Sequence, residues 1–314
     1  MKFTIFDELI ISSGGIKGIS LIGSLNELNK HYPIYNFKYL TGCSIGAVLC
    51  FLININYTID EINDIGLKLD FDNFQDLKLM NFIEKYGLDD GFKMTNLLKA
   101  FIIHKNFDPN ITFLELFEKT NKILTITSVN ITKGISEYHN YLTQPNLSIL
   151  LSIRMSTNIP IVFSPIKFNN NYYIDGAFLD PYPYYYHKNI KKKIGIWLFE
   201  KENIYFLKNN YLETLNNSIA NPINNSLNYI LNLLNILFLN YMKKYYKKMP
   251  KDTIYVDIYS QNSISFKLDI EEKMKIYQFG IKKCKNFFKL LYKKRRIYFL
   301  MNKYYYLWRR KIKK

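Results

Sequence analysis

Short apolar runs alternate with helical patterns along most of the chain. Residues 9–12 form an apolar run that ends at glycines, which is typical of a short buried strand. Leu21, Leu25 and Leu28 follow at the spacing of one apolar helix face. Further strands are predicted at 37–43, 124–131, 193–199 and 253–258, with a hairpin at 165–174 that turns at asparagines. This alternation predicts an α/β fold, a three-layer α/β/α sandwich around a mostly parallel sheet.

Charge is distributed unevenly along the 314 residues. The chain has 43 basic and 26 acidic residues and a formal net charge of +17. Residues 282–314 hold 14 of the basic residues and no acidic one, which leaves a net charge of +3 for the rest. Residues 268–301 have the pattern of one or two amphipathic helices that run into this basic tail. We therefore predict a core at 8–200, a helical region with the last strand at 201–281, and a basic aromatic-rich helical extension at 282–314.

Composition excludes several classes of protein. With 48% hydrophobic residues the chain can bury a sizeable core, unlike a disordered chain, a collagen-like repeat or a small disulfide scaffold. Three cysteines, Cys43, Cys50 and Cys284, make no disulfide framework, and an odd count favours a reducing compartment. We see no secretory signal, no run of about 18 apolar residues and no Cys/His spacing typical of zinc. We expect a protein that is not secreted and needs no metal or other cofactor.

The pentapeptide Gly42-Cys43-Ser44-Ile45-Gly46 lies where a predicted strand meets a predicted helix. Flanking glycines permit a tight turn that strains the backbone of the serine and projects its Oγ from the end of the sheet. The start of the helix favours negative charge that develops nearby. The pattern indicates a nucleophile elbow, although a plain glycine-flanked turn with a solvated serine has the same spacing.

Residues 13–18 form a glycine-rich loop, Ser-Gly-Gly-Ile-Lys-Gly, between the first strand and the first helix. Backbone N–H groups of such a loop bind anions, either a phosphate or an oxyanion. The Gly-Lys-Ser/Thr of a Walker loop is missing, as is an acidic residue at the end of the next strand, which a dinucleotide fingerprint needs. An oxyanion hole fits better, because the loop precedes an elbow in the same sheet.

A third motif, Asp175-Gly176-Ala177, follows the predicted hairpin. Asp-Gly alone is a common turn, but with the two earlier motifs in this order the chain resembles the patatin-like phospholipase family. The marks of that family are a G-x-G-x-x-G loop, a G-x-S-x-G elbow and a D-G-A/G motif. The likeness continues at 111–116 and 153–160, covers about residues 8–200, and is weaker at 253–288. Two departures are Ser13, in place of the first loop glycine, and Asp180, where the family often has asparagine.

The resemblance implies a patatin-like fold and a lipid acyl hydrolase of phospholipase A type, a carboxylic ester hydrolase without a metal. Ser44 would attack the ester carbonyl, Asp175 would accept the serine proton and return it to the leaving alcohol, and water would release the acyl group. The substrate would be a phospholipid or an acylglycerol. Backbone N–H groups of the loop would hold the oxyanion, and Lys17 would also orient the loop or meet a head group. The implied loop residues are Gly14, Gly15, Ile16, Lys17 and Gly18, and the implied elbow and motif residues are Gly42, Gly46, Gly176 and Ala177.

Two other functions remain open at this stage. A Ser-His-Asp esterase would place its histidine after the acid, and of His31, His104, His139 and His187 only the last qualifies. The tyrosines and lysines around His187 indicate a surface loop, which argues against that role. A catalytically silent protein that binds lipid or nucleic acid is the other alternative, and the intact Ser44 and Asp175 argue against it.

The tail at 282–314 mixes lysine and arginine with many aromatic residues. This composition favours an anionic membrane surface. Nucleic acid is an alternative partner, since the same residues can track a phosphate backbone and stack bases. It is less favoured, because the tail is attached to a chain that resembles a lipid hydrolase.

We interpret the apolar stretch at 226–242 as a helix over the acyl-chain pocket or on the sheet rather than one that enters lipid. The expected location is cytoplasmic and peripheral on membranes, with the oligomeric state open.

Overall fold

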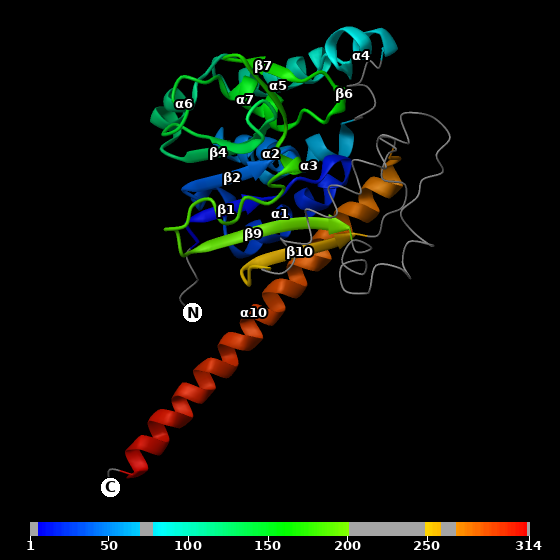
Figure 1. Cartoon of the computed structure of the whole chain (residues 1–314). Helices are drawn as coiled ribbons and strands as arrows, with labels where there is room; N and C mark the ends of the chain where they lie inside the picture. Colours follow the sequence, from blue (N-terminus) through cyan, green and yellow to red (C-terminus); the bar gives the residue numbers. More distant parts are fainter. Residues whose placement is uncertain (1–5, 70–77, 201–248, 259–267, 313–314) are drawn as a thin grey trace, which may run out of the picture.

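The computed structural model describes residues 6–69, 78–200, 249–258 and 268–312 (Figure 1). Its centre is an eight-stranded mixed sheet. The strands of this sheet are β1 (Glu8–Ile11), β2 (Tyr39–Cys43), β4 (Ile123–Asn130), β5 (Ile135–His139), β7 (Ile166–Phe168), β8 (Asn171–Asp175), β9 (Lys193–Glu200) and β10 (Thr253–Ile258). A separate small parallel pair consists of β3 (Gly87–Asp89) and β6 (Ile161–Phe163).

Helices flank the sheet. They are α1 (Ile19–His31), α2 (Ile45–Asn54), α3 (Ile59–Lys68), α4 (Leu79–Lys85), α5 (Phe92–His104), α6 (Phe113–Thr120), α7 (Ile149–Ser156) and α10 (Ile270–Ile312). Short 3₁₀ turns lie at η1 (Gly15–Gly18), η2 (Ile34–Asn36) and η4 (Gly176–Phe178). The predicted helical stretch at 203–250, with its apolar part at 226–242, lies outside the described residues, apart from 249 and 250.

The strand order is β10-β9-β1-β2-β4-β8-β7, with β5 paired to β4. The five strands from β10 to β4 run parallel, so their carboxyl ends lie at one edge of the sheet. The strands β5 and β8 pair antiparallel with β4, and β7 pairs antiparallel with β8. The predicted α/β fold, its largely parallel sheet and its main strands are confirmed. The hairpin is also confirmed, and Asn169 and Asn170 at its turn both have positive φ, as a tight two-residue hairpin requires.

Successive residues of β1 serve both faces of the sheet. Leu9 and Ile11 belong to the large core beneath the helices, whereas Ile10 packs in a smaller aromatic cluster with Tyr182 and Trp197. A strand covered on both faces has no polar alternation, which explains why β1 is a continuous apolar run.

The start of α6 follows directly from the sequence. The Thr112 hydroxyl accepts a hydrogen bond from the N–H of Glu115, and the Glu115 carboxylate accepts one from the N–H of Thr112. This capping box satisfies N–H groups that the first turn of a helix leaves unpaired. It lies within 111–116, one of the segments that carry the family likeness.

The C-terminal helix α10 is one continuous helix of 43 residues, about 65 Å long at 1.5 Å per residue. It runs beside α1 in the same direction, because Gly280 lies against Ser20 and Tyr292 lies 3.1 Å from His31 at the end of α1. A Cβ on Gly280 would overlap the Ser20 carbonyl oxygen, so this glycine lets the two backbones touch. Figure 1 shows the remainder of α10 continuing past the body toward the C terminus.

The boundary predicted at 281/282 therefore falls inside α10, which passes through it unbroken. In the described part of the chain, no helix combines the length and the apolar character that a bilayer span requires.

Candidate active site

Ser44 occupies the turn between β2 and α2 and has φ 54° and ψ −125°, a strained backbone conformation for a residue with a side chain. The glycines on either side are required by close packing. A Cβ on Gly42 would overlap the carbonyl of Gly46, and a Cβ on Gly46 would overlap the carbonyl of Ile11. The G-x-S-x-G spacing thus permits a turn that projects the Ser44 side chain at the carboxyl edge of the sheet.

Two strands from distant parts of the chain meet end to end beside β4. Cys43, the last residue of β2, pairs with Thr127, and Asp175, the last residue of β8, pairs with the next residue, Ser128. The ends of β2 and β8 therefore face each other. Ser44 Oγ donates a hydrogen bond of 2.6 Å to Asp175 Oδ2, although 131 residues separate the two positions.

The Asp175 carboxyl is 2% exposed and is held by a hydroxyl and an amide. Its second oxygen, Oδ1, accepts a hydrogen bond of 2.8 Å from the N–H of Ala177. Burial raises the pKa of Asp175 from 3.8 to about 7, and the bonds from Ser44 and Ala177 oppose that rise. Such a group exchanges a proton near neutral pH. Gly176 must lack a side chain, because a Cβ there would overlap the Thr127 carbonyl.

The glycine-rich loop lies against the elbow. Gly15 adopts a left-handed φ of 50°, and a Cβ on Gly18 would come within 2.7 Å of the Ile45 side chain, the residue after Ser44. Ser13, which replaces the first glycine of the family motif, is held by a 2.8 Å hydrogen bond from its N–H to the carbonyl of Pro181. The end of the η1 turn thus packs against the residue after Ser44, and the half-buried Ile16 and Lys17 belong to this turn.

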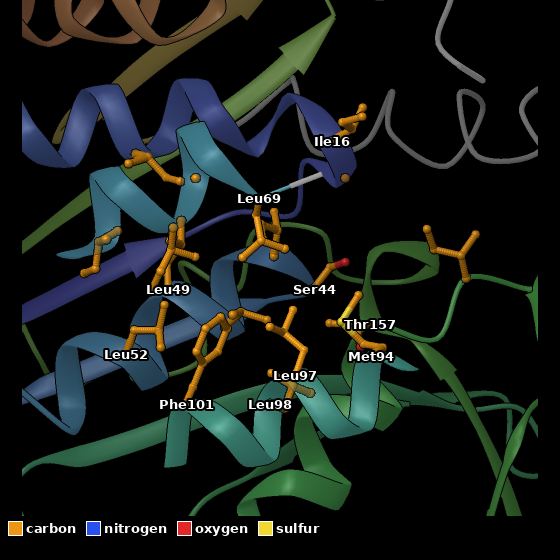
Figure 2. Close-up of a pocket in the computed structure, with 18 of the residues that line it drawn as sticks. Ile16, Ser44, Leu49, Leu52, Leu69, Met94, Leu97, Leu98, Phe101 and Thr157 are labelled. Carbon is orange, nitrogen blue, oxygen red and sulfur yellow. The ribbon is translucent and has the colours of Figure 1, made fainter. Parts of the chain in front are cut away.

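An apolar pocket opens at Ser44 (Figure 2). It encloses about 1000 Å³ of empty space, including its open mouth, and α2, α3 and α5 supply most of its wall. Ser44 lies at one end and Leu52 and Phe101 lie at the other (Figure 2). From Ser44 to Leu52 the helix α2 rises by about 12 Å. The pocket is therefore deep and apolar, and the Ser44 hydroxyl is part of its lining.

His187 lies at the opposite edge of the sheet. Its Nδ1 is 2.7 Å from Oε1 of Glu8, which pairs with Tyr39 at the start of β2. His187 Nδ1 also lies 3.4 Å from the Thr41 hydroxyl. Along β2, Thr41 and Ser44 are about 10 Å apart at 3.3 Å per residue, so His187 does not reach Ser44. The side chain of His187 is only 18% exposed. The expected surface loop is present, with Tyr185, Lys188 and Lys191 exposed, but the His187 side chain turns inward from it. The geometry excludes the Ser-His-Asp triad that the sequence had left open.

The other histidines also have different partners. His31 stacks on Phe288, His104 lies 3.7 Å from Glu61, and His139 Nε2 lies 2.7 Å from the Ser128 hydroxyl. Burial lowers the pKa of His139 to about 4. All four histidines lie in the described ranges, and none of them hydrogen-bonds to Ser44 or Asp175 there. Within those same ranges, no group of three or more His, Cys, Asp or Glu side chains could hold a metal ion.

Residues 156–158, to which no role was assigned from the sequence, contact both members of the pair. The Ser156 hydroxyl accepts a 2.9 Å hydrogen bond from the N–H of Ser44, and the Asn158 carbonyl accepts a 2.9 Å bond from the N–H of Asp175. The likeness at 153–160 marked this segment without indicating what it touches.

Comparisons with known proteins identify the family of this chain. The sequence model of a family described as patatin-like phospholipase matches residues 9–186. The probable lipid hydrolase 463L of Invertebrate iridescent virus 6 is 36% identical over 207 residues, which cover 63% of this chain and 70% of that protein. The uncharacterized protein R571 of Acanthamoeba polyphaga mimivirus is 28% identical over 285 residues, 88% of this chain and 92% of that protein.

A solved structure shows the same fold. VipD from Legionella pneumophila superimposes with a TM-score of 0.54 and 16% identity, over 90% of this chain and 66% of VipD. This chain thus spans just under two thirds of the length of VipD.

Proposed function

Because the chain belongs to the patatin-like phospholipase family and is a hydrolase, we propose that it is a phospholipase A-type lipid acyl hydrolase with a Ser44–Asp175 dyad. The observation that carries the proposal is the 2.6 Å hydrogen bond between Ser44 Oγ and Asp175 Oδ2, with Ser44 lining a deep apolar pocket. The hydroxyl supplies a nucleophile, the carboxylate a base, and the pocket a place for one acyl chain.

In the first half of the reaction, Ser44 Oγ forms a bond to the ester carbonyl carbon while Asp175 takes the hydroxyl proton. The carbonyl oxygen becomes an oxyanion. As the tetrahedral intermediate collapses, the carbon–oxygen bond to the alcohol breaks and Asp175 returns the proton to that alcohol. In the second half, Asp175 takes a proton from water, which attacks the acyl-enzyme, and the proton returns to Ser44 as the fatty acid leaves. A pKa of about 7 suits a group that must accept and return a proton in each half.

The loop of η1 is the proposed oxyanion hole. Its last residue, Gly18, packs against Ile45 of the elbow, Gly15 lines the same pocket as Ser44, and the N–H of Gly14 donates to no acceptor among the described residues. Preorganised N–H donors of this kind typically contribute about 3–4 kcal/mol each to stabilisation of the transition state.

The decisive experiment measures fatty-acid release from mixed anionic phospholipid vesicles with EDTA present. We expect release by the wild type and loss of about 10⁴-fold or more in the Ser44→Ala variant, because the nucleophile is removed. Equal release by both proteins would contradict the dyad. No release by the wild type on phospholipid or acylglycerol would favour a silent lipid-binding protein.

For the tail at 282–314 we propose binding to an anionic lipid surface. Its supports are 14 basic residues without an acidic one, interleaved aromatic residues, and a continuous helix that extends beyond the end of α1. Each basic residue near an anionic surface contributes about 1 kcal/mol. The helix leaves the body at the amino edge of the sheet, the edge away from Ser44, so the tail anchors the protein without lining the pocket.

This second proposal is tested by pelleting the full chain with anionic vesicles. The variant replaces four consecutive basic residues of the tail by serine, namely Lys293, Lys294, Arg295 and Arg296. The matched control replaces four exposed lysines of the body, namely Lys119, Lys167, Lys188 and Lys191. We expect binding to fall at least tenfold in the tail variant and little in the control. Equal binding by both variants would rule out the tail as anchor, and retention of single-stranded nucleic acid instead would assign the tail to that partner.

A further inference from the structure

The backbone N–H of Ser44 leaves the sheet at the elbow. Cys43 still pairs with Thr127 of β4, but Ser44 turns away into α2 with a positive φ. In place of the next ladder partner, the Ser156 hydroxyl accepts the Ser44 N–H at 2.9 Å. Ser156 is the last residue of α7 and is fully buried. A side chain therefore satisfies a buried amide that the turn would otherwise leave without an acceptor.

The direction of these hydrogen bonds is fixed. The Ser156 hydroxyl has one proton, and it donates this proton to the Thr127 carbonyl at 2.6 Å. Its lone pairs are then left to accept from Ser44. The chain of bonds runs from the Ser44 amide through the Ser156 hydroxyl to the carbonyl of Thr127, the residue beside Ser128, with which Asp175 pairs.

The same short segment also holds the partner of Ser44. Two residues after Ser156, the Asn158 carbonyl accepts the N–H of Asp175, and the Asn158 side-chain amide donates to the carbonyls of Ser164 and Tyr173. Residues 156–158 are thus bonded to the backbone at both ends of the Ser44–Asp175 pair.

We infer that Ser156 is a positioning residue, whose hydroxyl holds Ser44 in its strained conformation at hydrogen-bond distance from Asp175. The inference rests on the proposed function, since it assigns a role in that reaction to a residue remote from the substrate. A strained backbone persists only where its surroundings over-determine it. A displacement of about 1 Å at a reacting group can cost about 100-fold in rate.

The helix α7 supplies a matched control. Ser152 lies one turn before Ser156 and is equally buried, and its hydroxyl has no hydrogen-bond partner among the described residues. Ser156→Ala and Ser152→Ala therefore each remove one buried hydroxyl from the same helix. Only the first removes a bond to Ser44.

The test compares hydrolysis of a soluble short-chain ester by the wild type and both variants across pH 5–9. We expect kcat of S156A to fall by about 10- to 100-fold with KM nearly unchanged, and S152A to stay near the wild type. The hydrogen bond from Ser44 lowers the pKa of Asp175, so weakening it raises that pKa. The acidic limb of the S156A profile should therefore move to higher pH. Ser156→Cys, which keeps a weak acceptor of similar size, should lie between alanine and wild type.

Several results would overturn the inference. One is that S156A and S152A have equal kcat values and equal acidic limbs in their pH profiles. Another is that the loss of kcat in S156A equals the fraction of that variant that circular dichroism shows to be unfolded. Labelling of Ser44 by a fluorophosphonate separates this failure from that of the proposed function. If hydrolysis and labelling both persist in the Ser44→Ala variant, the proposed function is wrong. If labelling depends on Ser44 but S156A and S152A have equal kcat values, only the role of Ser156 is wrong.

Discussion

Two buried carboxylates lie at opposite edges of the same sheet and have opposite surroundings. Glu8, at the amino edge, lies 2.7 Å from His187 Nδ1 and 3.2 Å from Lys193 Nζ, and it accepts a 2.8 Å hydrogen bond from the Thr41 hydroxyl. Asp175, at the carboxyl edge, is hydrogen-bonded among the described residues only to the Ser44 hydroxyl and the Ala177 amide. The two groups are equally hidden from water, at 0% and 2% exposure.

The difference lies in the nature of the partners rather than in the burial. A buried carboxylate between two basic side chains is compensated, and removing it would leave those groups without a counter-charge. A buried carboxylate that has only neutral donors keeps a high proton affinity, which is why the pKa of Asp175 rises to about 7. The first arrangement suits structural stability and the second suits proton transfer. Three experiments can test this difference between Glu8 and Asp175.

The largest expected effect is on activity at the carboxyl edge. Asp175→Asn should lower kcat by about 10⁴-fold or more, because the base is removed while the shape is kept. The ionised carboxylate is unfavourable in the folded state, so the same variant should be more stable than the wild type at pH 8, by roughly 1–4 kcal/mol. Urea denaturation and ester hydrolysis measure the two effects. A variant that is both active and destabilised would show that Asp175 is structural.

The second effect is on stability at the amino edge. Glu8→Gln should destabilise the fold by about 3–5 kcal/mol, because it leaves the buried Lys193 without its counter-charge. At temperatures where the variant is folded, its kcat should match the wild type, since Thr41, the partner of Glu8 on β2, is about 10 Å from Ser44 along the strand. Glu118→Gln, at an exposed glutamate, is the control for urea denaturation. A large loss of kcat in folded E8Q would contradict the division between the two edges.

The smallest effect is a pH dependence. Asp175 acts in its ionised form, and its pKa is about 7, so kcat/KM should rise about tenfold per unit below pH 7 and level off above it. Folding stability should respond in the opposite sense. The folded pKa lies above the unfolded value of 3.8, so the contribution of Asp175 is full below about pH 4 and is lost as pH rises toward 7. A rate that is flat from pH 5 to 8 would show that Asp175 titrates well below 5 or is not the base.

Much of the fold could be predicted because its strands are apolar and its turns carry distinctive residues. The run at 9–12, the asparagine turn of the hairpin and the glycines around Ser44 each determine local backbone geometry. The strand β5 was not predicted, because it is short and contains Glu137 and His139 where an apolar pattern was sought. Its pairing with β4 supplies the support that its own sequence does not indicate.

The contacts of the site were harder to predict than its motifs. The order of the motifs placed Ser44 and Asp175 in one site, but nothing local shows that β2 and β8 meet end to end beside β4. His187 is flanked by tyrosine and lysine, which suggested solvent, while its partner Glu8 lies 179 residues earlier in the chain. The Ser156 hydroxyl likewise contacts Ser44 across 112 residues, and only the tertiary fold gives it an acceptor's role.

The length of α10 also determines how far the basic tail extends from the body of the protein. Tyr292 meets His31 at the end of α1, and the helix then continues to Ile312, a further rise of about 30 Å. The end of a flexible chain with the same number of residues would lie at widely varying distances from the body, whereas a helix keeps its end at one distance. If the basic end of α10 binds a surface, the rigid helix holds the body of the protein at a distance from that surface. The number of helical turns in α10 then determines the distance between its basic end and Ser44. Adding or removing one turn would change that distance by about 5.4 Å.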